Sequence, residues 1–312
     1  MNKKDDHTIS ISIVSAIYNE ASSVSSLLDD IQKTLRSKSL SYEIIIVDDG
    51  SDDETLNTLK MHLNFIAHLK VVELERNVGQ VNALSAGMTV AEGEWIVMMD
   101  GDLQHDPKDI LRFLEYRNKG CDLIASYRIK RDESFRRKLI TWIGNYVNRF
   151  LIGANIKDFG SAYRMMHMSL INSLKDSNGN VYYNTPKLYT LSRKYVQLPI
   201  TQYKRPHGTT KWNLRMFVAY NMDFITASQR IAVLLIFASM FGVVTGFVLY
   251  FLKIFGIFKD VQAVSAPASI LLSSFTLSMI AVIWREVIVS QELIKGVPSF
   301  IIKKIWAAPP KS

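Results

Sequence analysis

The chain has 312 residues, enough for about two domains, and 48% of them are hydrophobic, which excludes a disordered chain. Its 15 Gly and 8 Pro exclude collagen-like and low-complexity chains. Cys121 is the one cysteine, which excludes an intrachain disulfide and a cysteine-based zinc site. Residues 1–6 are charged and contain no apolar signal region, so we expect the N-terminal part to be cytosolic.

Charge is divided unevenly along the chain, whose formal net charge is +8. Residues 1–110 carry 19 acidic and 9 basic side chains, whereas residues 111–212 carry 6 acidic and 19 basic ones. An acidic block followed by a basic block predicts two charged partners, a cation and an anion. The alternative is solvated surface charge that binds nothing. A nucleic-acid partner is not expected, because the N-terminal half is acidic and no nucleic-acid-binding motif is present.

The first third of the chain alternates between strand-like and helix-like segments. This alternation predicts an α/β domain with a mostly parallel sheet. Ligands of such sheets bind beyond the carboxyl ends of the strands, where the acidic clusters of this chain fall. In chain order, strands are predicted at 9–17, 42–47, 71–74, 95–99 and 122–126, and helices at 22–37, 53–69, 81–91 and 107–119.

The first acidic cluster, residues 48–54, follows the strand predicted at 42–47. Its leading carboxylates, Asp48 and Asp49, can accept hydrogen bonds from a base N–H or a ribose hydroxyl. The alternative is a helix N-cap, because Ser, Asp and Glu all favour a first helical turn. Both interpretations can hold together, with the first aspartates functional and the later ones capping.

A second carboxylate pair, Asp100 and Asp102, flanks Gly101 directly after a predicted strand. Two carboxylates separated by one residue can reach one divalent cation, and Gln104 adds a neutral oxygen. Such oxygen ligands favour Mg²⁺ or Mn²⁺, and a site with few protein ligands keeps places for substrate phosphates. The alternative for an Asp-x-Asp pattern is an ordinary turn. His105, next to this motif, is interpreted as a bystander.

Basic residues gather in the second third of the chain, beside Gly and Thr. Arginine and lysine in such a setting suit phosphate oxygens, whereas the alternative for each single arginine is a solvated surface residue. The segments are Tyr127–Arg128 with Arg131, residues 158–164, and residues 205–212.

Two uncharged segments near the C-terminus, Ile231–Leu252 and Val261–Trp284, predict a transmembrane helix hairpin, for which a buried core hairpin is the alternative. Basic residues flank its outer ends, so the positive-inside bias predicts cytoplasmic termini. Residues 212–230 predict an interfacial helix on the bilayer. Phe135–Leu151 is a second interfacial candidate, for which a core-facing amphipathic helix is an equal alternative.

Five motifs follow one another in the order Ser15–Glu20, Asp48–Ser51, Arg76–Gln80, Asp100–Gln104 and Arg205–Lys211. This series resembles that of family 2 glycosyltransferases with the GT-A fold. More narrowly, it is similar to the polyprenyl-phosphate glycosyltransferases, such as bactoprenol glucosyltransferase, the undecaprenyl-phosphate aminoarabinose-type transferase and dolichyl-phosphate mannose synthase. The Gln-x-x-Arg-Trp motif of processive polysaccharide synthases is absent from the sequence.

The resemblance implies inverting, metal-dependent transfer of a sugar from a nucleotide-sugar to undecaprenyl phosphate. The expected donor is a UDP-hexose such as UDP-glucose, and the product would serve the synthesis or modification of cell-envelope glycans such as lipopolysaccharide. One alternative is use of GDP-mannose, as in dolichyl-phosphate mannose synthase, and another is a different acceptor. A third, of a different class, is a catalytically inactive membrane-anchored scaffold. The interfacial helices also offer a surface for a homo-oligomer.

The resemblance further implies roles for single residues on the donor side. Asp100, Asp102 and Gln104 would hold Mg²⁺ or Mn²⁺ on the diphosphate, with Gly101 between them in the nucleotide-sugar site. Arg205 and Lys211 would grip the same diphosphate. The residues implied to line the nucleotide pocket are Ala16, Tyr18, Glu20, Val47 and Asp49.

On the acceptor side, the resemblance implies that Arg128 and Arg131 take the lipid phosphate. We expect Asp158 to orient the acceptor or the sugar rather than to remove a proton, because a phosphate monoester is already largely dianionic at neutral pH. Asp102, Asp158, Arg128 and Arg131 are therefore the expected catalytic residues.

The expected organisation has four parts and two membrane spans. The protein is expected to be integral to the cytoplasmic (inner) membrane, with the catalytic domain and both termini in the cytoplasm. The parts are a GT-A catalytic domain at 1–211, an interfacial helix at 212–230, a transmembrane hairpin at 231–290 and a cytoplasmic tail at 291–312.

Overall fold

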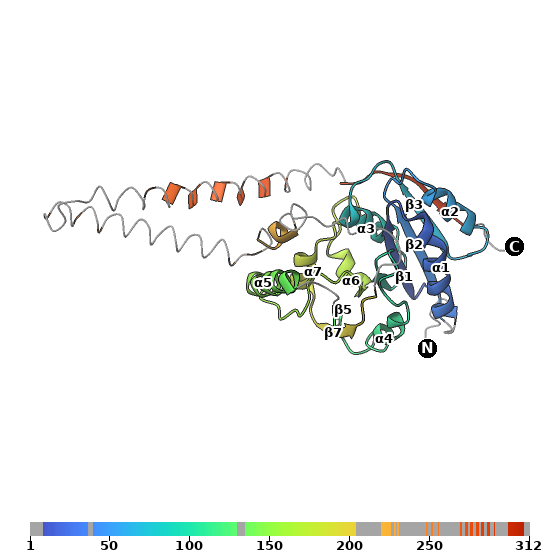
Figure 1. Ribbon diagram of the computed structural model, residues 1–312, viewed down its shortest axis with the longest axis horizontal. Helices are drawn as coiled ribbons and strands as arrows, with labels where there is room; N and C mark the ends of the chain where they lie inside the picture. Colours follow the sequence, from blue (N-terminus) through green and yellow to red (C-terminus); the bar gives the residue numbers. More distant parts are fainter. Residues whose placement is uncertain are drawn as a thin grey trace.

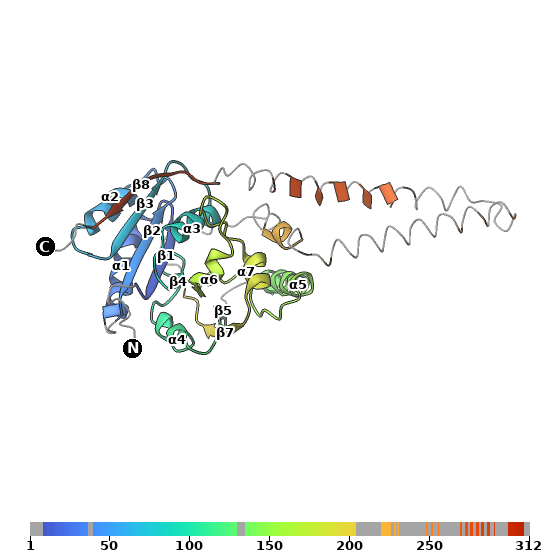
Figure 2. The same cartoon turned by 180° about the vertical axis from the view of Figure 1, so that it is seen from behind.

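The computed structural model describes residues 9–36, 40–129, 135–203, 220–225 and 299–308, with isolated positions between 228 and 290. Its core is an eight-stranded sheet with helices on both faces, as Figure 1 and Figure 2 show from opposite sides. The strands are β1 (Ile11–Ile17), β2 (Tyr42–Asp48), β3 (Leu69–Leu74), β4 (Trp95–Met98), β5 (Leu123–Arg128), β6 (Arg164–His167), β7 (Tyr195–Ile200) and β8 (Ile302–Ala307). The helices are α1 (Ala21–Arg36), α2 (Thr55–His62), α3 (Gln80–Thr89), α4 (Asp109–Leu114), α5 (Phe135–Ile152), α6 (Met168–Asn172) and α7 (Thr185–Leu191).

The sheet is mixed, with the strand order β7-β5-β6-β4-β1-β2-β3-β8. Strands β4, β1, β2 and β3 pair in parallel, and so do β5 and β7. Strand β6 runs antiparallel to both of its neighbours, and β8 runs antiparallel to β3. The predicted α/β class is confirmed, and β6 and β8, which no prediction covered, make the sheet mixed.

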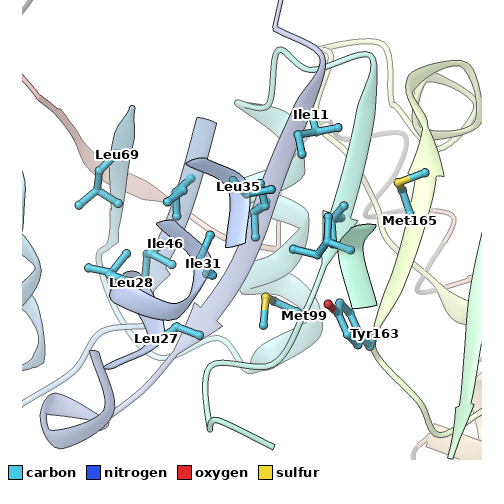
Figure 3. Packing of buried hydrophobic residues seen from close by; sticks show 14 of the residues in the cluster. Ile11, Leu27, Leu28, Ile31, Leu35, Ile46, Leu69, Met99, Tyr163 and Met165 are labelled. Atoms are coloured by element: carbon cyan, nitrogen blue, oxygen red, sulfur yellow. The ribbon is translucent and has the colours of Figure 1, made fainter. Parts of the chain in front are cut away.

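Each face of the sheet carries its own apolar layer, because successive side chains of a strand point to opposite faces. Helices α1, α2 and α4 cover one face, and α3, α6 and α7 cover the other. On the second face Gly87 lets α3 approach closely, since a Cβ there would lie 2.5 Å from Val14 Cγ1. Figure 3 shows the first layer, in which α1 contributes Leu27, Leu28, Ile31 and Leu35 over Ile11, Ile46 and Leu69.

The helices predicted at 53–69 and 107–119 are shorter in the structure than the apolar periodicity indicated. The first, α2, ends at His62, because the chain must turn before β3 begins at Leu69. The second, α4, ends at Leu114, after which N–H groups bond carbonyls three residues back, as Tyr116 N bonds Phe113 O at 2.9 Å. Periodicity does not distinguish such turns from a continuing α-helix.

Strand β8 lies within the predicted tail 291–312 and covers the outer edge of β3. It is held by Glu73, a buried carboxylate of β3. Lys303 Nζ lies 2.7 Å from Glu73 Oε1, and Trp306 Nε1 donates to Glu73 Oε2 at 2.9 Å. Lys60 Nζ lies 3.7 Å from the same carboxylate and 4.1 Å from the centroid of the Trp306 ring. Residues 302–307 are therefore part of the α/β domain.

The predicted two-helix transmembrane hairpin is wrong. In the part of the chain that the structure describes, no helix is both long enough and apolar enough to cross a membrane. A span needs about 20 consecutive apolar residues, whereas α5, with 18 residues, includes Arg136, Arg137, Lys138 and Arg149. Most of Ile231–Leu252 and Val261–Trp284, and most of 212–230, lies outside the described residues. The expected location in the inner membrane depended on this hairpin, so that expectation is withdrawn as well.

Helix α5 turns apolar side chains toward solvent, which contradicts the core-facing alternative for Phe135–Leu151. Trp142 is 65% exposed and Tyr146 66%, whereas the polar Asn148 is only 3% exposed. The prediction that this helix is interfacial stays a prediction. The other exposed apolar residues of the helix are Ile143, Val147 and Phe150.

Replacing Glu73 by Gln is expected to weaken the attachment of β8. Burial raises the pKa of Glu73, but the hydrogen bonds from Lys303 and Trp306 and the charge of Lys60 lower it below 4.5 overall. A carboxylate with a lowered pKa stabilises the folded chain above its ordinary pKa, and this contribution is lost as pH falls through the folded value. Glu73→Gln should therefore reduce the free energy of unfolding at neutral pH by about 1 kcal/mol and flatten its acid limb.

Urea unfolding of both proteins across the acid range measures this effect. The matched control is Glu75→Gln, because Glu75 is exposed and lies two residues further along. An acid limb that is equally steep in Glu73→Gln and in the unmodified chain would contradict the assigned role of Glu73.

Candidate active site

The predicted motifs meet at one edge of the sheet. Strands β4, β1 and β2 are parallel neighbours, so their carboxyl ends lie side by side. Residues 18–20 follow β1, Asp48 ends β2, and Asp100 comes two residues after the end of β4. Strand β5 runs in the same direction and ends at Arg128. The acidic motifs and one arginine of the basic block therefore share an edge, as strand direction in an α/β sheet predicts.

Asp49 fastens the loop that leads into α3. Its Oδ1 accepts the N–H of Val78 at 2.8 Å, and its Oδ2 accepts the N–H of Gly79 at 3.0 Å. Gly50, with φ +68°, allows this contact, since a Cβ there would lie 2.6 Å from the backbone C of Arg76. Burial raises the pKa of Asp49. Both oxygens of this carboxylate are thus engaged with the protein backbone.

The other residues predicted for the nucleotide pocket have different surroundings. Val47 is fully buried in the second apolar layer. Ala16, Tyr18 and Glu20 are half-buried where β1 ends. Asp53 Oδ1 accepts the N–H of Thr55, the first residue of α2, at 2.9 Å, whereas the N-cap position is Glu54, whose side chain makes no capping hydrogen bond.

The carboxylate of Asp100 is held on both oxygens. Gln80, the first residue of α3, donates from Nε2 to Oδ1 at 2.6 Å. His105 Nε2 lies 3.1 Å from Oδ2. Burial opposes ionisation of Asp100, but the hydrogen bonds from His105 and Gln80 and the nearby charge of Arg128 hold its pKa below the ordinary value. His105 is therefore a partner of Asp100 and not a bystander.

The rest of this motif is set by a tight turn. A Cβ on Gly101 would lie 2.3 Å from Ile17 Cγ2, so only glycine fits between the two carboxylates. Asp102 is 8% exposed and accepts the N–H of Gln104 at 3.1 Å through Oδ1. The side chain of Gln104 donates from Nε2 to the carbonyl of Tyr203 at 3.1 Å.

The half-buried Arg128 and the buried Asp158 form a bidentate ion pair. Arg128 Nε lies 2.7 Å from Asp158 Oδ2, and Nη2 lies 2.9 Å from Oδ1. The backbone N–H groups of Arg128 and Gly160 also donate to this carboxylate, at 3.3 and 3.1 Å. Both oxygens of Asp158 thus accept hydrogen bonds, which is the environment of an orienting carboxylate more than that of a free base.

The loop that carries Asp158 belongs to the segment 158–164, whose basic residues the sequence analysis expected beside phosphate oxygens. A Cβ on Gly160 would lie 2.7 Å from Arg128 Nη2, so this glycine makes room for the guanidinium. Ser161 Oγ lies 2.5 Å from Ser126 Oγ of β5. Arg164, fully buried, donates to the carbonyl of Ser161. The Asp-Phe-Gly-Ser sequence indicated a functional loop. The residues that contact this loop lie on β5 and β6, so the sequence next to the loop does not reveal them.

The two halves of the site are in contact with each other. The ring of His105 lies against that of Tyr163, with centroids 4.9 Å apart. The Tyr163 hydroxyl donates to the carbonyl of Asp106 at 3.0 Å. Because β4 and β5 run in the same direction and His105 lies against Tyr163, the carboxylate motif after β4 and the Arg128–Asp158 pair border one region. Arg131, Arg205 and Lys211 lie outside the described residues.

A divalent cation fits the donor set after β4. Within the described ranges, no group of three or more His, Cys, Asp and Glu side chains could hold a metal ion by itself. Asp100 and Asp102 supply two carboxylates on either side of a glycine that cannot be larger. Two hard oxygen ligands, with the remaining positions filled by phosphate and water, are the usual protein contribution to a Mg²⁺ or Mn²⁺ site at a substrate diphosphate.

The fold is similar to that of glucosyl-3-phosphoglycerate synthase from Mycobacterium tuberculosis. Its complex with phosphoglyceric acid matches with a TM-score of 0.53 and 18% identity, over 70% of this chain and 78% of that one. Its complex with Mn²⁺, UDP-glucose and phosphoglyceric acid matches with the same TM-score and 19% identity, over the same shares of the two chains. At such identity the likeness concerns the fold alone, and it supports the GT-A-like domain.

Two kinds of relative are similar in sequence. Dodecaprenyl-phosphate galacturonate synthase of Rhizobium johnstonii is 32% identical over 70% of this chain and 66% of its own length. Undecaprenyl-phosphate 4-deoxy-4-formamido-L-arabinose transferase of Pectobacterium atrosepticum is 28% identical over 71% of this chain and 68% of its own. The matched region therefore spans about two thirds of these relatives. Residues 12–175, which contain β1 to β6 and both carboxylate motifs, match the model of glycosyl transferase family 2, and the chain belongs to that family of glycosyltransferases, as its motifs indicated.

Proposed function

We propose that this protein transfers a sugar from a nucleotide-sugar, a UDP-hexose such as UDP-glucose, to a polyprenyl phosphate such as undecaprenyl phosphate. Mg²⁺ or Mn²⁺ would be held on the diphosphate by Asp100 and Asp102, and Arg128 would receive the acceptor phosphate. The product would be a lipid-phosphate-linked sugar for cell-envelope glycans.

The proposal is carried by one observation, the position of Asp100 near the half-buried guanidinium of Arg128. Asp100 is near enough to Arg128 for the arginine to lower its pKa, and His105 and Tyr163 join the loops that bear the two groups. A cation site beside an anion site is what joining two phosphate-bearing substrates requires. The cation would offset the charge of the donor, and the guanidinium that of the acceptor.

The chemistry needs no external base. An oxygen of the acceptor phosphate forms a bond to the anomeric carbon while the bond from that carbon to the diphosphate oxygen breaks. The nucleoside diphosphate leaves with the electron pair, and a bound cation would neutralise its developing charge. The acceptor has a second pKa of about 6, so at neutral pH it is already a dianionic nucleophile. Attack from the opposite face inverts the anomeric centre.

Asp158 would then act by orientation. Its carboxylate fixes Arg128 through Nε and Nη2 and leaves the flat guanidinium in one position at the end of β5. A fixed guanidinium can take a phosphate with little loss of conformational entropy, which favours in-line attack.

Two further observations support a lipid-linked acceptor. The relatives are named for polyprenyl phosphates of different chain length and for different sugars, so the acceptor class is their common feature. Helix α5 exposes Trp142, Tyr146 and Phe150, an apolar face that suits an isoprenoid chain or the surface of a bilayer. The two sugars in the relatives' names differ, so several donors are compared in the assay.

A transfer assay in detergent tests the proposal. The purified chain would be incubated with undecaprenyl phosphate and labelled UDP-glucose, UDP-galacturonate or GDP-mannose, with Mg²⁺ or with a chelator. We expect label from a UDP-sugar to enter the organic phase only with the metal. Asp102→Asn should lower this rate by about 100-fold, because the charge on the leaving diphosphate loses its counter-charge. Asp106→Asn is the matched control, because its half-buried side chain only accepts the N–H of Lys108 in the next turn.

The possible failures of this assay have different meanings. Nucleotide binding without label in the lipid would contradict the acceptor. Label from GDP-mannose alone would contradict the proposed use of a UDP-sugar as donor. Absence of nucleotide binding would favour an inactive scaffold.

Asp158→Asn is expected to raise the KM for the acceptor by about 10- to 100-fold, because Arg128 loses one charge-assisted partner. The shape of the pH–rate profile should stay that of the unmodified enzyme, with an acid limb set by the acceptor phosphate. Steady-state kinetics across pH with each substrate varied in turn measures both quantities. A general base must be deprotonated to act and therefore contributes to the acid limb, so a shallower acid limb in Asp158→Asn together with an unchanged acceptor KM would identify Asp158 as a general base and contradict the orienting role.

A further inference from the structure

We propose that His105 is a positioning residue that fixes the carboxylate of Asp100 in the orientation needed to bind the divalent cation. This role rests on the proposed function, because it concerns the same cation. It goes beyond that function by giving a task to a residue outside the Asp-x-Asp pattern.

The contact geometry holds the carboxylate from two separate elements. His105 Nε2 lies 3.1 Å from Asp100 Oδ2, and Gln80 Nε2 donates to Oδ1 at 2.6 Å. Gln80 starts α3, whereas His105 lies in the loop between β4 and α4. The carboxylate cannot rotate about its Cβ–Cγ bond without breaking one of these contacts.

The two side chains differ in burial, which assigns the supporting role to His105 and the metal-binding role to Asp100. The His105 side chain is 2% exposed, whereas that of Asp100 is 23% exposed. A cation that arrives with its hydration water can therefore reach Asp100 but not His105. Hydrogen-bonded partners behind a ligating carboxylate are a general feature of metal sites, where they fix the orientation of the ligand.

The ring of His105 is itself held by packing. Tyr163, fully buried, lies against it with centroids 4.9 Å apart and planes at 38°. Tyr163 is fixed in turn by Phe113 and by its hydrogen bond to the carbonyl of Asp106. His105 Nδ1 is buried and has no hydrogen-bond partner among the described residues. The proton is therefore assigned to Nε2, which faces the carboxylate oxygen.

The plain alternative is that His105 only fills space beside Tyr163. Two substitutions separate the alternatives because each keeps one property of the imidazole. His105→Phe keeps the ring on Tyr163 and removes the N–H. His105→Gln removes the ring and keeps an amide N–H at about the reach of Nε2. If His105 acts only by packing, His105→Phe should preserve Mn²⁺ affinity better than His105→Gln. If His105 positions the carboxylate, His105→Gln should preserve it better.

The readout is Mn²⁺ affinity, measured from the electron paramagnetic resonance of free Mn²⁺ with the full chain and UDP or GDP. We expect His105→Phe to weaken Mn²⁺ binding by about 10- to 100-fold. His105→Gln should stay within a few-fold of the unmodified chain. Thermal unfolding without Mn²⁺ measures the packing contribution separately. The matched control is His167→Phe, because His167 also lies against an aromatic ring, Trp95, but at the opposite end of β4.

If His105→Phe does not fold, a comparison of His105→Asn with His105→Gln still tests the positioning role. Asn and Gln are both polar, but the Asn amide is too short to reach the Nε2 position, so His105→Asn should lose Mn²⁺ affinity that His105→Gln keeps. Equal affinities in the two variants, or full affinity in a folded His105→Phe, would overturn the positioning role alone. Absence of Mn²⁺ binding by the unmodified chain with either nucleotide would overturn the proposed metal dependence and the role of His105 with it.

Discussion

The bidentate ion pair between the half-buried Arg128 and the buried Asp158 fixes the geometry of the whole site. Charges of this kind are stable away from water only when their hydrogen-bonding groups are matched. Here the match uses Nε and Nη2 of the arginine and backbone N–H groups on both sides. Removing either partner would leave the other charge uncompensated. The pair therefore ties the end of β5 to the loop before β6.

That loop is also anchored by elements that come from other parts of the chain. Asn145 of α5 accepts the N–H of Phe159 at 3.3 Å, and Tyr220 donates to its carbonyl at 2.8 Å. The Phe159 ring packs edge-on against Tyr189 and Phe224. The loop proposed to receive the acceptor is thus held by contacts from several elements, which suits a role in which binding energy is used for orientation.

The donor side was the more predictable half, because its information is local. Asp49, Asp100 and Asp102 stand directly after strands, and strand direction alone brings such residues to one edge. The sequence did not reveal contacts between residues that are far apart along the chain. His105 meets Tyr163 only because β6 runs antiparallel between β4 and β5. Glu73 and Trp306 are 233 residues apart, and no local pattern marks the segment 302–307 as the strand that covers β3.

The errors in prediction also have physical causes. Apolar periodicity continued through turns after α2 and α4, since turns and helices bury side chains at similar spacing. Apolar length alone suggested a membrane hairpin that no helix in the described part of the chain supports. The interpretation of His105 as a bystander failed for a different reason. A side chain's partners five residues away depend on backbone reversals such as that at Leu103, whose φ is +60°.

The central claim is that the cation and the acceptor phosphate share one site, and phosphorus NMR tests it most directly. A short-chain isoprenyl phosphate would be added to the full chain with UDP and Mn²⁺. The account predicts that bound Mn²⁺ broadens the phosphorus resonance of the monoester, and that Arg128→Ala abolishes this broadening at equal Mn²⁺ occupancy. A monoester that binds through Arg128 without being broadened by Mn²⁺ would place the two sites apart and contradict the account.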